Sequence, residues 1–326
     1  MPELVCAATD LKWHEHRRAG ITATDIVTIL GLSTHHSPWS LYQVKTGNLP
    51  EQPDNDRLRL GRELEPVIVS RWIEQSGLFV YPGGLYRSGD RPWQLATIDR
   101  AVRSTIVLAI DPGPAESVLE LKSWADADRH RWDDGPPPAV RAQALWQMDV
   151  MDVSTGHVGV LFLPSGEFRS YTIEHDDVNH FHDDATGAIA YTPECDVCER
   201  IDAMRSEARD FLDRIDLKDP PSVDGSAATL AALKAVYAPV PDVTREVDAH
   251  LIEYLADARA VKRAAEADVR HAEAKLREQA GDATVLTVAG VKAATRSISS
   301  SPVKAHIRKV DKWTITSAGK DTDDQP

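Results

Sequence analysis

The stretch Val118–Trp124, VLELKSW, decides which fold the sequence predicts. Alternate residues of a β-strand share a face, so Glu120 and Lys122 lie together while Leu119 and Leu121 point the other way. Two interpretations fit this alternation. The strand could be half exposed with an ion pair on its wet side, or it could hold two catalytic groups side by side on a rigid element. The rest of the chain has to distinguish them.

Length and composition bound the class of protein. The chain has 326 residues, of which 42% are hydrophobic and 27% are charged, as in ordinary globular proteins. This length favours one domain of about 200 residues with an appendage, or two domains. No apolar run is long enough to span a membrane, and the N-terminus, MPELVCAATD, lacks the pattern of a secretory signal. The sequence therefore predicts a cytoplasmic protein with no membrane partner.

The formal net charge of −14 argues against a protein that binds nucleic acid over its whole surface. Net charge governs solubility and long-range attraction, however, whereas a site needs only a local basic surface or its own divalent cations to meet phosphate. Nucleic-acid chemistry at one site is therefore still possible.

Three cysteines, Cys6, Cys195 and Cys198, are too few for a disulfide framework and fit a reducing compartment. Cys195 and Cys198 have the spacing of half a metal site, and His180 or His182 could complete a zinc site. We regard that as the weaker interpretation, because the chain has no second cysteine pair. The role of Cys195 and Cys198 stays open.

Helical periodicity dominates the first part of the chain and then gives way to short β-like runs separated by turn signals. The predicted helices span about Thr22–Gly31, Pro38–Thr46 and Leu58–Gly77. The predicted strands are Leu78–Tyr81, Trp93–Thr97, Ala101–Ala109 and Val118–Lys122. A helix at about Ala139–Val153 follows, then strands His157–Leu163 and Phe168–Ile173 and a helical region Asp177–Leu217. This order predicts an α/β (α+β) fold with a central mixed β-sheet flanked by helices.

The C-terminal third has a different pattern. Asp219–Ser226 is typical of a linker, and Val243–Ala280 predicts one long helix with a heptad-like apolar seam. Such a seam needs a partner, for which Ala227–Tyr237 is the nearest candidate. A hairpin at Val285–Ser297 and a strand near Trp313–Thr316 complete the region. We therefore expect three parts: a core over residues 1–217, a C-terminal helical hairpin with a small β tail over 218–316, and a disordered tail over 317–326.

Acidic residues earlier in the chain favour the interpretation of VLELKSW as a strand with catalytic groups. Asp99 ends a predicted strand, and Glu65 lies on the third predicted helix beside residues of its buried side. If Glu65, Asp99 and Glu120 converge at one edge of the sheet, their oxygens would hold one or two Mg²⁺ or Mn²⁺ ions. Lys122 could orient or deprotonate a water, or neutralise charge on phosphate. Such an assembly hydrolyses phosphodiesters.

These residues also carry a family resemblance. An Asp followed on the next strand by Glu-x-Lys resembles the PD-(D/E)XK nuclease superfamily, and four ordered blocks around it resemble the YqaJ-like viral recombinases, relatives of the phage lambda exonuclease. The blocks are RRAGITATDIVTILGLS (Arg17–Ser33), SPWSLYQVKTG (Ser37–Gly47), LRLGRELEPVI (Leu58–Ile68) and AQALWQMDV (Ala142–Val150). The resemblance implies a restriction-endonuclease-like core over residues 1–217.

The resemblance also implies roles for single residues. It makes Glu65, Asp99, Glu120 and the main-chain carbonyl of Leu121 metal ligands, and Lys122 the catalytic lysine. The remaining matches are Gln143 and Gln147, which would line the site, and Arg17 and Thr24, which would contact the 5′ phosphate of DNA.

Three features depart from the family pattern. Ile98 stands where the family has proline, and Leu145 stands where many members have another glutamine. Asp111 is a rival to Asp99 at the spacing that some members use, but we prefer Asp99 because Asp111 lies in a DPG turn.

The sequence therefore predicts a Mg²⁺-dependent deoxyribonuclease. By resemblance it would be an exonuclease that degrades one strand of duplex DNA from a 5′ end. The 3′ overhang would serve a strand-annealing partner in phage-type recombination, and the chain would form a homo-oligomer, a trimer by resemblance. Two alternatives stay open: a CRISPR-associated or restriction-type nuclease, and a non-catalytic DNA-end-binding module on a nuclease fold. Glu65 could also be a surface residue paired with Arg62, and Gln143 and Gln147 could face solvent.

Overall fold

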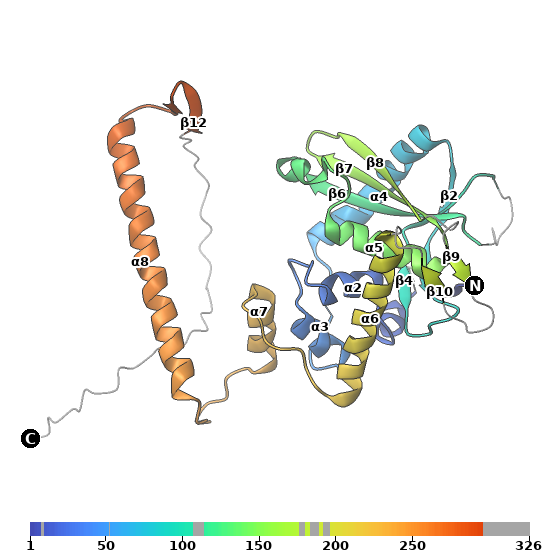
Figure 1. Cartoon of the computed structure of the whole chain (residues 1–326), viewed down its shortest axis with the longest axis horizontal. Helices are drawn as coiled ribbons and strands as arrows, with labels where there is room; N and C mark the ends of the chain where they lie inside the picture. Colours follow the sequence, from blue (N-terminus) through green and yellow to red (C-terminus); the bar gives the residue numbers. More distant parts are fainter. Residues whose placement is uncertain are drawn as a thin grey trace, which may run out of the picture. The chain divides into compact units, whose positions relative to one another are not determined.

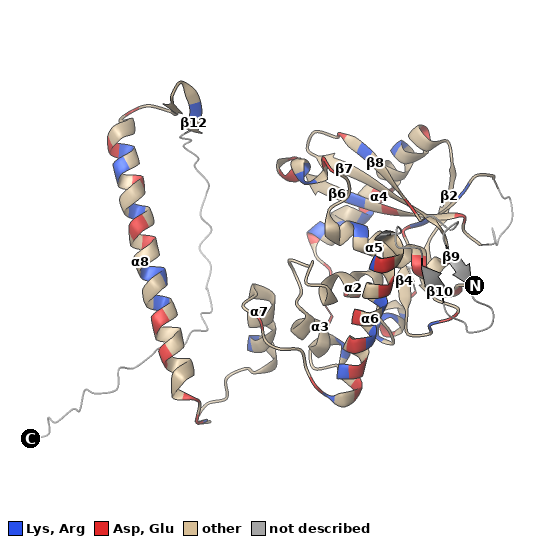
Figure 2. Cartoon of the chain, viewed as in Figure 1, with Lys and Arg blue, Asp and Glu red and all other residues tan. Residues whose placement is uncertain are grey.

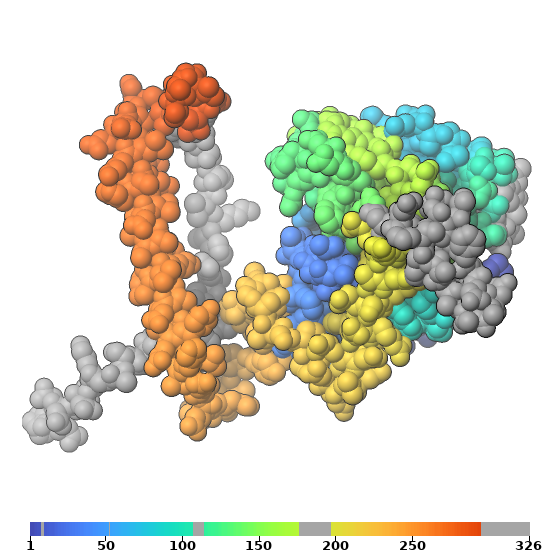
Figure 3. Space-filling model, viewed as in Figure 1, coloured from blue at the N-terminus to red at the C-terminus, as the bar shows by residue number. Residues whose placement is uncertain are grey.

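The computed structural model describes residues 1–7, 10–51, 53–106, 114–175, 180–182, 189–191 and 196–295. The chain divides into two compact units, Met1–Pro239 and Val240–Pro326, and each is described by itself (Figures 1 and 3). None of the described helices combines the length and the apolar character that a membrane span requires.

A five-stranded sheet forms the centre of the first unit (Figure 1). Its order is β2-β5-β6-β7-β8, in which only β6 and β7 are parallel and the other neighbours are antiparallel. The predicted central mixed sheet with flanking helices is therefore confirmed. The bounds are β2 Phe79–Pro82, β5 Arg100–Arg103, β6 Ser117–Ala125, β7 Thr155–Leu163 and β8 Phe168–Glu174.

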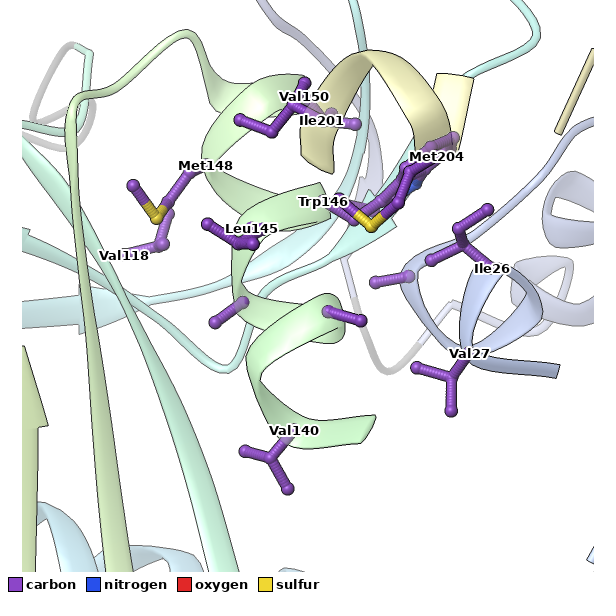
Figure 4. Close-up of a cluster of buried hydrophobic side chains, with 14 of the residues drawn as sticks. Ile26, Val27, Val118, Val140, Leu145, Trp146, Met148, Val150, Ile201 and Met204 are labelled. Carbon is purple, nitrogen blue, oxygen red and sulfur yellow. The ribbon is translucent and has the colours of Figure 1, made fainter. Parts of the chain in front are cut away.

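Alternate residues of β6 enter two different hydrophobic cores. Leu119 and Leu121 pack with Ile68 and Trp72 in what we call the α4 core, named after helix α4 (Asp56–Ser76). Val118 instead packs in the larger α5 core, named after helix α5 (Pro138–Met151). Helices α4 and α5 therefore cover opposite faces of the sheet. Figure 4 shows part of the α5 core, where residues of α5 lie near residues of β6, of helix α2 (Ala23–Ile29) and of helix α6 (Asp196–Leu217). The labelled residues are Ile26, Val27, Val118, Val140, Leu145, Trp146, Met148, Val150, Ile201 and Met204.

Local signals fix the ends of the N-terminal helices. Thr22 and Ser37 each form a capping box at the start of a helix, and Asn55 caps α4. Helix α4 ends at Gly77, whose φ of 70° is the left-handed conformation that glycine adopts most easily. The bounds are α2 Ala23–Ile29 and α3 Pro38–Lys45, close to the predicted ranges.

A second, three-stranded sheet of order β1-β3-β4 packs beside the main one and was not fully predicted. Only β4 matches a predicted strand, and the predicted strand Ala101–Ala109 is shorter in the structure, where β5 ends at Arg103. A short helix, α1, also precedes the first predicted one. The bounds are β1 Glu3–Ala7, α1 Trp13–Arg18, β3 Gly84–Arg87 and β4 Leu95–Thr97.

Two glycines allow unusually close packing near β5 and β7. A Cβ atom on Gly83 would lie 1.9 Å from the carbonyl oxygen of Ile98, and one on Gly156 would lie 2.6 Å from the sulfur of Met148. Both distances are shorter than any real carbon contact. Gly83 therefore lets the chain approach the segment before β5, and Gly156 lets α5 approach β7.

The predicted helical region Asp177–Leu217 is helical only in its second part. Two short antiparallel strands, β9 and β10, precede the helix, so the prediction of a helix from residue 177 was wrong for these residues. The bounds are η1 Asp126–Trp132, a 3₁₀ helix that precedes α5, then β9 His180–His182, β10 Ile189–Tyr191 and α6 Asp196–Leu217. Helix α6 packs against α2 and α5 and extends the α5 core.

Helix α7 (Ala227–Val236) belongs to the first unit, whereas the sequence assigned it to the C-terminal region as the partner of the long helix. It packs against α3 through Thr229 and Ala232, which are buried, and the Thr229 hydroxyl lies 2.6 Å from that of Ser37. Small residues on α7 allow this close contact with the start of α3.

The described part of the second unit contains one long helix and one hairpin. Helix α8 spans Ala249–Ala280, and strands β11 (Val285–Val288) and β12 (Val291–Thr295) pair antiparallel. The long helix and the hairpin were both predicted. The predicted strand near Trp313–Thr316 and the predicted tail 317–326 lie outside the described residues.

A buried ion pair holds α1, α2 and α3 together. The Lys45 ammonium lies 2.7 Å from an Asp25 oxygen and donates to the carbonyls of Arg17, at 2.9 Å, and Gly20, at 2.6 Å. The two side chains are only 7% and 12% exposed. Burial raises the pKa of the Asp25 carboxyl, but the charges of Lys45 and Arg17 outweigh it and hold that pKa below its ordinary value.

Replacing Lys45 with methionine should lower the free energy of unfolding by about 3–5 kcal/mol, because the buried Asp25 carboxylate loses its partner. Urea unfolding followed by tryptophan fluorescence measures the loss. Because the pKa of Asp25 is lowered by folding, its contribution is complete above the ordinary pKa and is lost as the pH falls through the folded-state pKa. The difference between wild type and Lys45→Met should therefore shrink in acid.

The matched control is Lys12→Met, at a lysine that is exposed. It should change the stability by less than about 0.5 kcal/mol. A loss of similar size in both variants would contradict a structural role for the buried pair.

Candidate active site

Glu120 and Lys122 lie on the face of β6 that α5 covers. The side chain of Glu120 is only 2% exposed and that of Lys122 is 24% exposed. The Lys122 ammonium donates to a Glu120 oxygen and, at 3.0 Å, to the side-chain oxygen of Gln143 on α5. A wet surface ion pair, the first interpretation of VLELKSW, is therefore excluded by the burial of Glu120.

Gln147, one turn after Gln143 on α5, bonds to two parts of the sheet. Its amide nitrogen donates to a Glu120 oxygen at 2.6 Å and to the main-chain carbonyl of Thr97 at 3.0 Å. The residue is fully buried, and its amide oxygen has no hydrogen-bond partner among the described residues. The alternative in which both glutamines face solvent is wrong, since Gln147 ties Glu120 to the end of β4 and leaves an acceptor for a further donor.

Asp99 follows β4 and faces the same point of β6. One of its oxygens accepts a hydrogen bond from the main-chain N–H of Leu121 at 2.8 Å. Burial, followed by repulsion from Glu120, raises the pKa of Asp99 to about 8, although Lys122 and the Leu121 N–H oppose the shift. Glu65 also raises the pKa of Asp99. Glu65, Glu120 and Lys122 therefore all lie close enough to Asp99 to interact with it electrostatically.

The carboxylates keep Lys122 charged. Burial alone lowers the pKa of the Lys122 ammonium, but Glu120 and Asp99 outweigh burial and raise the pKa above its ordinary value. The two hydrogen bonds of Lys122 both run to acceptors, as an ammonium requires.

Glu65 lies on α4 and pairs with a residue that the sequence analysis did not consider. One of its oxygens is 3.1 Å from the guanidinium of Arg100, while Arg62, the partner that the sequence suggested, pairs with Asp54. Arg100 follows Asp99 directly and begins β5. In the sequence, the only indication that Arg100 belongs to the site is its position next to Asp99, a candidate ligand. Its contact with α4 follows from the pairing of the strands, which the sequence does not show.

The three carboxylates do not form a preassembled metal cluster: among the described residues, no group of three or more His, Cys, Asp and Glu side chains is arranged to hold a metal ion. Glu65 is held by Arg100, Asp99 by Leu121 and Glu120 by Lys122 and Gln147. The donor set nevertheless fits a hard divalent cation. Carboxylate oxygens are its preferred ligands, and a cation would relieve the repulsion between Asp99 and Glu120.

Arg17 and Thr24 lie at the start of the helical layer. The Arg17 guanidinium stacks on Trp13, 4.3 Å from the ring centre, and lies 3.3 Å from the hydroxyl of Thr22. Thr24 is exposed in the first turn of α2. Within the described residues, no hydrogen bond joins either residue to the four charged groups of β6, Asp99 and Glu65.

Two other predictions fall partly on residues that the structure does not describe. Asp111, the rival of Asp99, and Cys195 lie outside the described residues, as do the side chains of His180 and His182. Cys198 is described, and its sulfur lies 3.0 Å from a ring nitrogen of His175.

A buried network anchors α5 at its C-terminal end. Asp149, two residues after Gln147, accepts hydrogen bonds from Gln94, from Arg91 at 3.1 Å and from Arg205 of α6 at 3.0 Å. The segment before β4 and helix α6 thus both bind the helix that presents the two glutamines, which fixes the height of α5 over the sheet.

Comparisons with known proteins identify a family that part of the chain resembles. Residues 12–157 match the model of the YqaJ-like viral recombinase domain. The chain is 24% identical to the protein described as uncharacterized protein YqaJ of Bacillus subtilis (strain 168) over 233 residues. This alignment covers 70% of the chain but only 63% of the relative, less than two thirds of its length.

Two solved structures resemble the chain more distantly. One is an alkaline exonuclease from Laribacter hongkongensis, 18% identical, with a TM-score of 0.46 over 64% of this chain and 94% of that one. The other is a phage-related exonuclease from Haemophilus somnus 129PT, 10% identical, with a TM-score of 0.40 over 61% of this chain and 96% of that one.

Replacing Gln147 with leucine should lower the free energy of unfolding by about 1–3 kcal/mol, because the Thr97 carbonyl and a Glu120 oxygen lose their donor inside the protein. The matched control is Gln143→Leu on the same helix, where the amide is partly exposed; it should cost less than about 1 kcal/mol. Urea unfolding measures both. An equal loss in the two variants would refute the special role of the Gln147 amide.

Proposed function

Residues 12–157 match the model of the YqaJ-like viral recombinase domain, and from this match we propose that the chain is a metal-dependent deoxyribonuclease. The observation that carries the proposal is the cluster around Glu120: Asp99, Glu120 and Lys122 lie together beneath α5, and Gln147 holds Glu120 in place. Carboxylates held around a partly buried lysine are costly, which supports a functional role for the cluster.

Each member of the cluster has a task that its contacts support. Asp99 and Glu120 provide oxygens for Mg²⁺ or Mn²⁺, with Glu65 and the Leu121 carbonyl as further ligands. When bound, one or two such ions would activate water and polarise the scissile phosphate. Lys122 places a positive charge beside Glu120, where it offsets negative charge that develops on the phosphate during attack.

The two glutamines act through position rather than charge. Gln147 fixes the carboxylate plane of Glu120 against the end of β4, which keeps Glu120 and Asp99 on the same side of the sheet. Its unused oxygen can accept a hydrogen bond from a water in the site. Gln143 holds Lys122 from the exposed side, and so keeps the ammonium from turning towards solvent.

For the substrate we propose the end of duplex DNA, cut from the 5′ end so that a 3′ overhang is left. This follows the family resemblance of Arg17 and Thr24, whose guanidinium and hydroxyl suit a terminal phosphate. The overhang would pass to a single-strand annealing protein in phage-type recombination. A homo-oligomer, with three copies by the same resemblance, would enclose the DNA.

The nuclease activity is tested with linear duplex DNA carrying 5′ phosphates, in Mg²⁺ or in EDTA. Wild type should degrade it only with the metal. Glu120→Gln, Asp99→Asn and Lys122→Met should each lower the rate at least about 100-fold, because each removes a group that stabilises the transition state.

Glu116→Gln is the matched control, since Glu116 lies just before β6, is exposed and has no part in the cluster. It should keep the wild-type rate. Cleavage in EDTA, or an unchanged rate in Glu120→Gln, would refute the proposal, and binding without cleavage in any divalent metal would favour the non-catalytic module. Loss of activity in Asp111→Asn but not in Asp99→Asn would transfer the ligand role to Asp111.

The polarity is tested separately with substrates that differ only at the 5′ end. Arg17→Ala should raise KM for 5′-phosphorylated duplex several-fold and leave KM for 5′-hydroxyl duplex almost unchanged, because only the first substrate offers the anion. Thr24→Val should show the same preference more weakly. Equal effects on the two substrates would show that Arg17 supports the fold instead of binding the phosphate.

A further inference from the structure

Helix α8 is long and regular, and no described residue of its own unit covers it. It runs for 32 residues, all of them within the described range, and none of them is buried. Large apolar side chains lie exposed along it, among them Leu251, Tyr254, Val261, Val269 and Leu276, each at least 50% exposed. A helix of this kind gains its stability from packing one face against a partner, so α8 is incomplete by itself.

The exposed apolar residues form one continuous seam. Steps of three or four residues connect its members, so all of them lie on one face of the helix. We call this set the α8 seam; its members are Leu251, Tyr254, Ala258, Val261, Ala265, Val269, Ala272 and Leu276. This pattern is typical of a helix that packs along its whole length against another helix.

Helix α7, which the sequence suggested as the partner of α8, already packs against another helix. Helix α7 belongs to the first unit, where its small residues pack against α3 and Thr229 bonds to Ser37. The seam therefore needs a helix from elsewhere.

The charges of α8 differ from those of the rest of the chain. The helix has six basic and six acidic residues and thus no formal net charge, so the whole net charge of −14 lies outside it. Two copies of α8 would not repel each other through net charge, whereas two arbitrary surfaces of this acidic protein would.

The charges also alternate in blocks along the helix, as Figure 2 shows by colour. An acidic block (Glu253, Asp257) precedes a basic one (Arg259, Lys262, Arg263), then a second acidic block (Glu266, Asp268) precedes a mainly basic end (Arg270, Glu273, Lys275, Arg277, Glu278). In a parallel pair in register, like blocks would meet. In a reversed pair the first acidic block faces the mainly basic end and the first basic block faces the second acidic block, which brings Asp257 to Arg270 and Arg259 to Asp268.

We propose that α8 pairs with α8 of a second copy of this chain in an antiparallel, two-fold symmetric coiled coil. The seam suits this pairing because its sizes are also complementary under reversal. A reversed copy centred between Arg263 and Ala264 brings Tyr254 beside Ala272 and Val269 beside Ala258. Large residues then meet small ones in the middle of the seam, which fills the interface there without overpacking, and Leu251 meets Leu276 at each end. The interface is isologous, so it closes at two copies of α8.

Single cysteines test the direction of pairing in the full-length chain. An added cysteine near the midpoint, Ala265→Cys, should link two copies efficiently with a short bismaleimide. A cysteine at the start, Ala249→Cys, should not link to itself, because the two positions would lie about 40 Å apart. A mixture of Ala249→Cys and Ala280→Cys should link to each other. The parent protein, which keeps its own three cysteines, provides the background; of these, Cys6 and Cys198 are buried.

Charged substitutions test the seam itself. Ala265→Glu with Ala272→Glu should halve the molar mass measured by light scattering, from dimer to monomer, or from six copies to three if the nuclease unit forms a trimer. Ala267→Glu with Ala274→Glu makes the same change with the same spacing on the opposite face, and should leave the mass unchanged. Cleavage of short duplex DNA should stay the same in both variants.

Three outcomes would overturn the proposal. Self-linking of Ala249→Cys as efficient as that of Ala265→Cys would mean a parallel pair. Absence of linking in all samples, together with the same mass in both glutamate variants, would mean that the seam is covered by residues 296–326 or by a different protein. An equal loss of mass in the seam and off-seam variants would mean a general effect of charge on α8.

Discussion

The burial of Glu120 beneath α5 is the constraint on which the rest of the first unit depends. A carboxylate that is 2% exposed is tolerated only with strong donors around it, and the protein provides two, the Lys122 ammonium and the Gln147 amide. Because Gln147 also binds the Thr97 carbonyl, α5 can occupy only one position over β4 and β6. Asp149 then fixes the far end of the same helix. The polar cluster thus sets where the helix lies, and the α5 core fills the space around it.

The opposite face of the sheet provides rigidity for the same cluster. Leu119 and Leu121 alternate with Glu120 and Lys122, and they pack against Ile68 of α4. Helix α4 also carries Glu65, so the element that buries the apolar face brings a charged group to the edge of the polar one. Arg100 pairs with that group at 3.1 Å. The buried polar cluster and the α4 core therefore use alternate positions of the same strand.

Much of this was predictable from the sequence, for identifiable reasons. Thr22, Ser37 and Asn55 cap the N-termini of helices α2, α3 and α4. The strand β6 is recognisable because apolar and charged residues alternate along it. Glu120, Lys122, Asp99 and Gln147 were expected together and lie together; their roles as ligands and catalytic groups stay predictions.

What the sequence did not reveal depends on contacts between distant segments. The unpredicted strands β1 and β3 are only five and four residues long, and they are stabilised by pairing with each other. The pairing of Glu65 with Arg100 depends on which strands are neighbours. The attachment of α7 to α3 depends on small residues whose partner lies about 190 residues away in the chain.

The close approaches at Gly83 and Gly156 mean that the site is sensitive to residues that have no chemistry of their own. Any side chain at Gly83 would collide with the backbone beside Asp99, and any side chain at Gly156 would press on Met148, next to Gln147. A random screen for inactive variants would therefore recover both glycines along with the charged residues. The positions at which a substitution disturbs the site therefore include more than its charged residues. They also include glycines, because the strands and the helix come close enough to share hydrogen bonds only where no side chain lies between them.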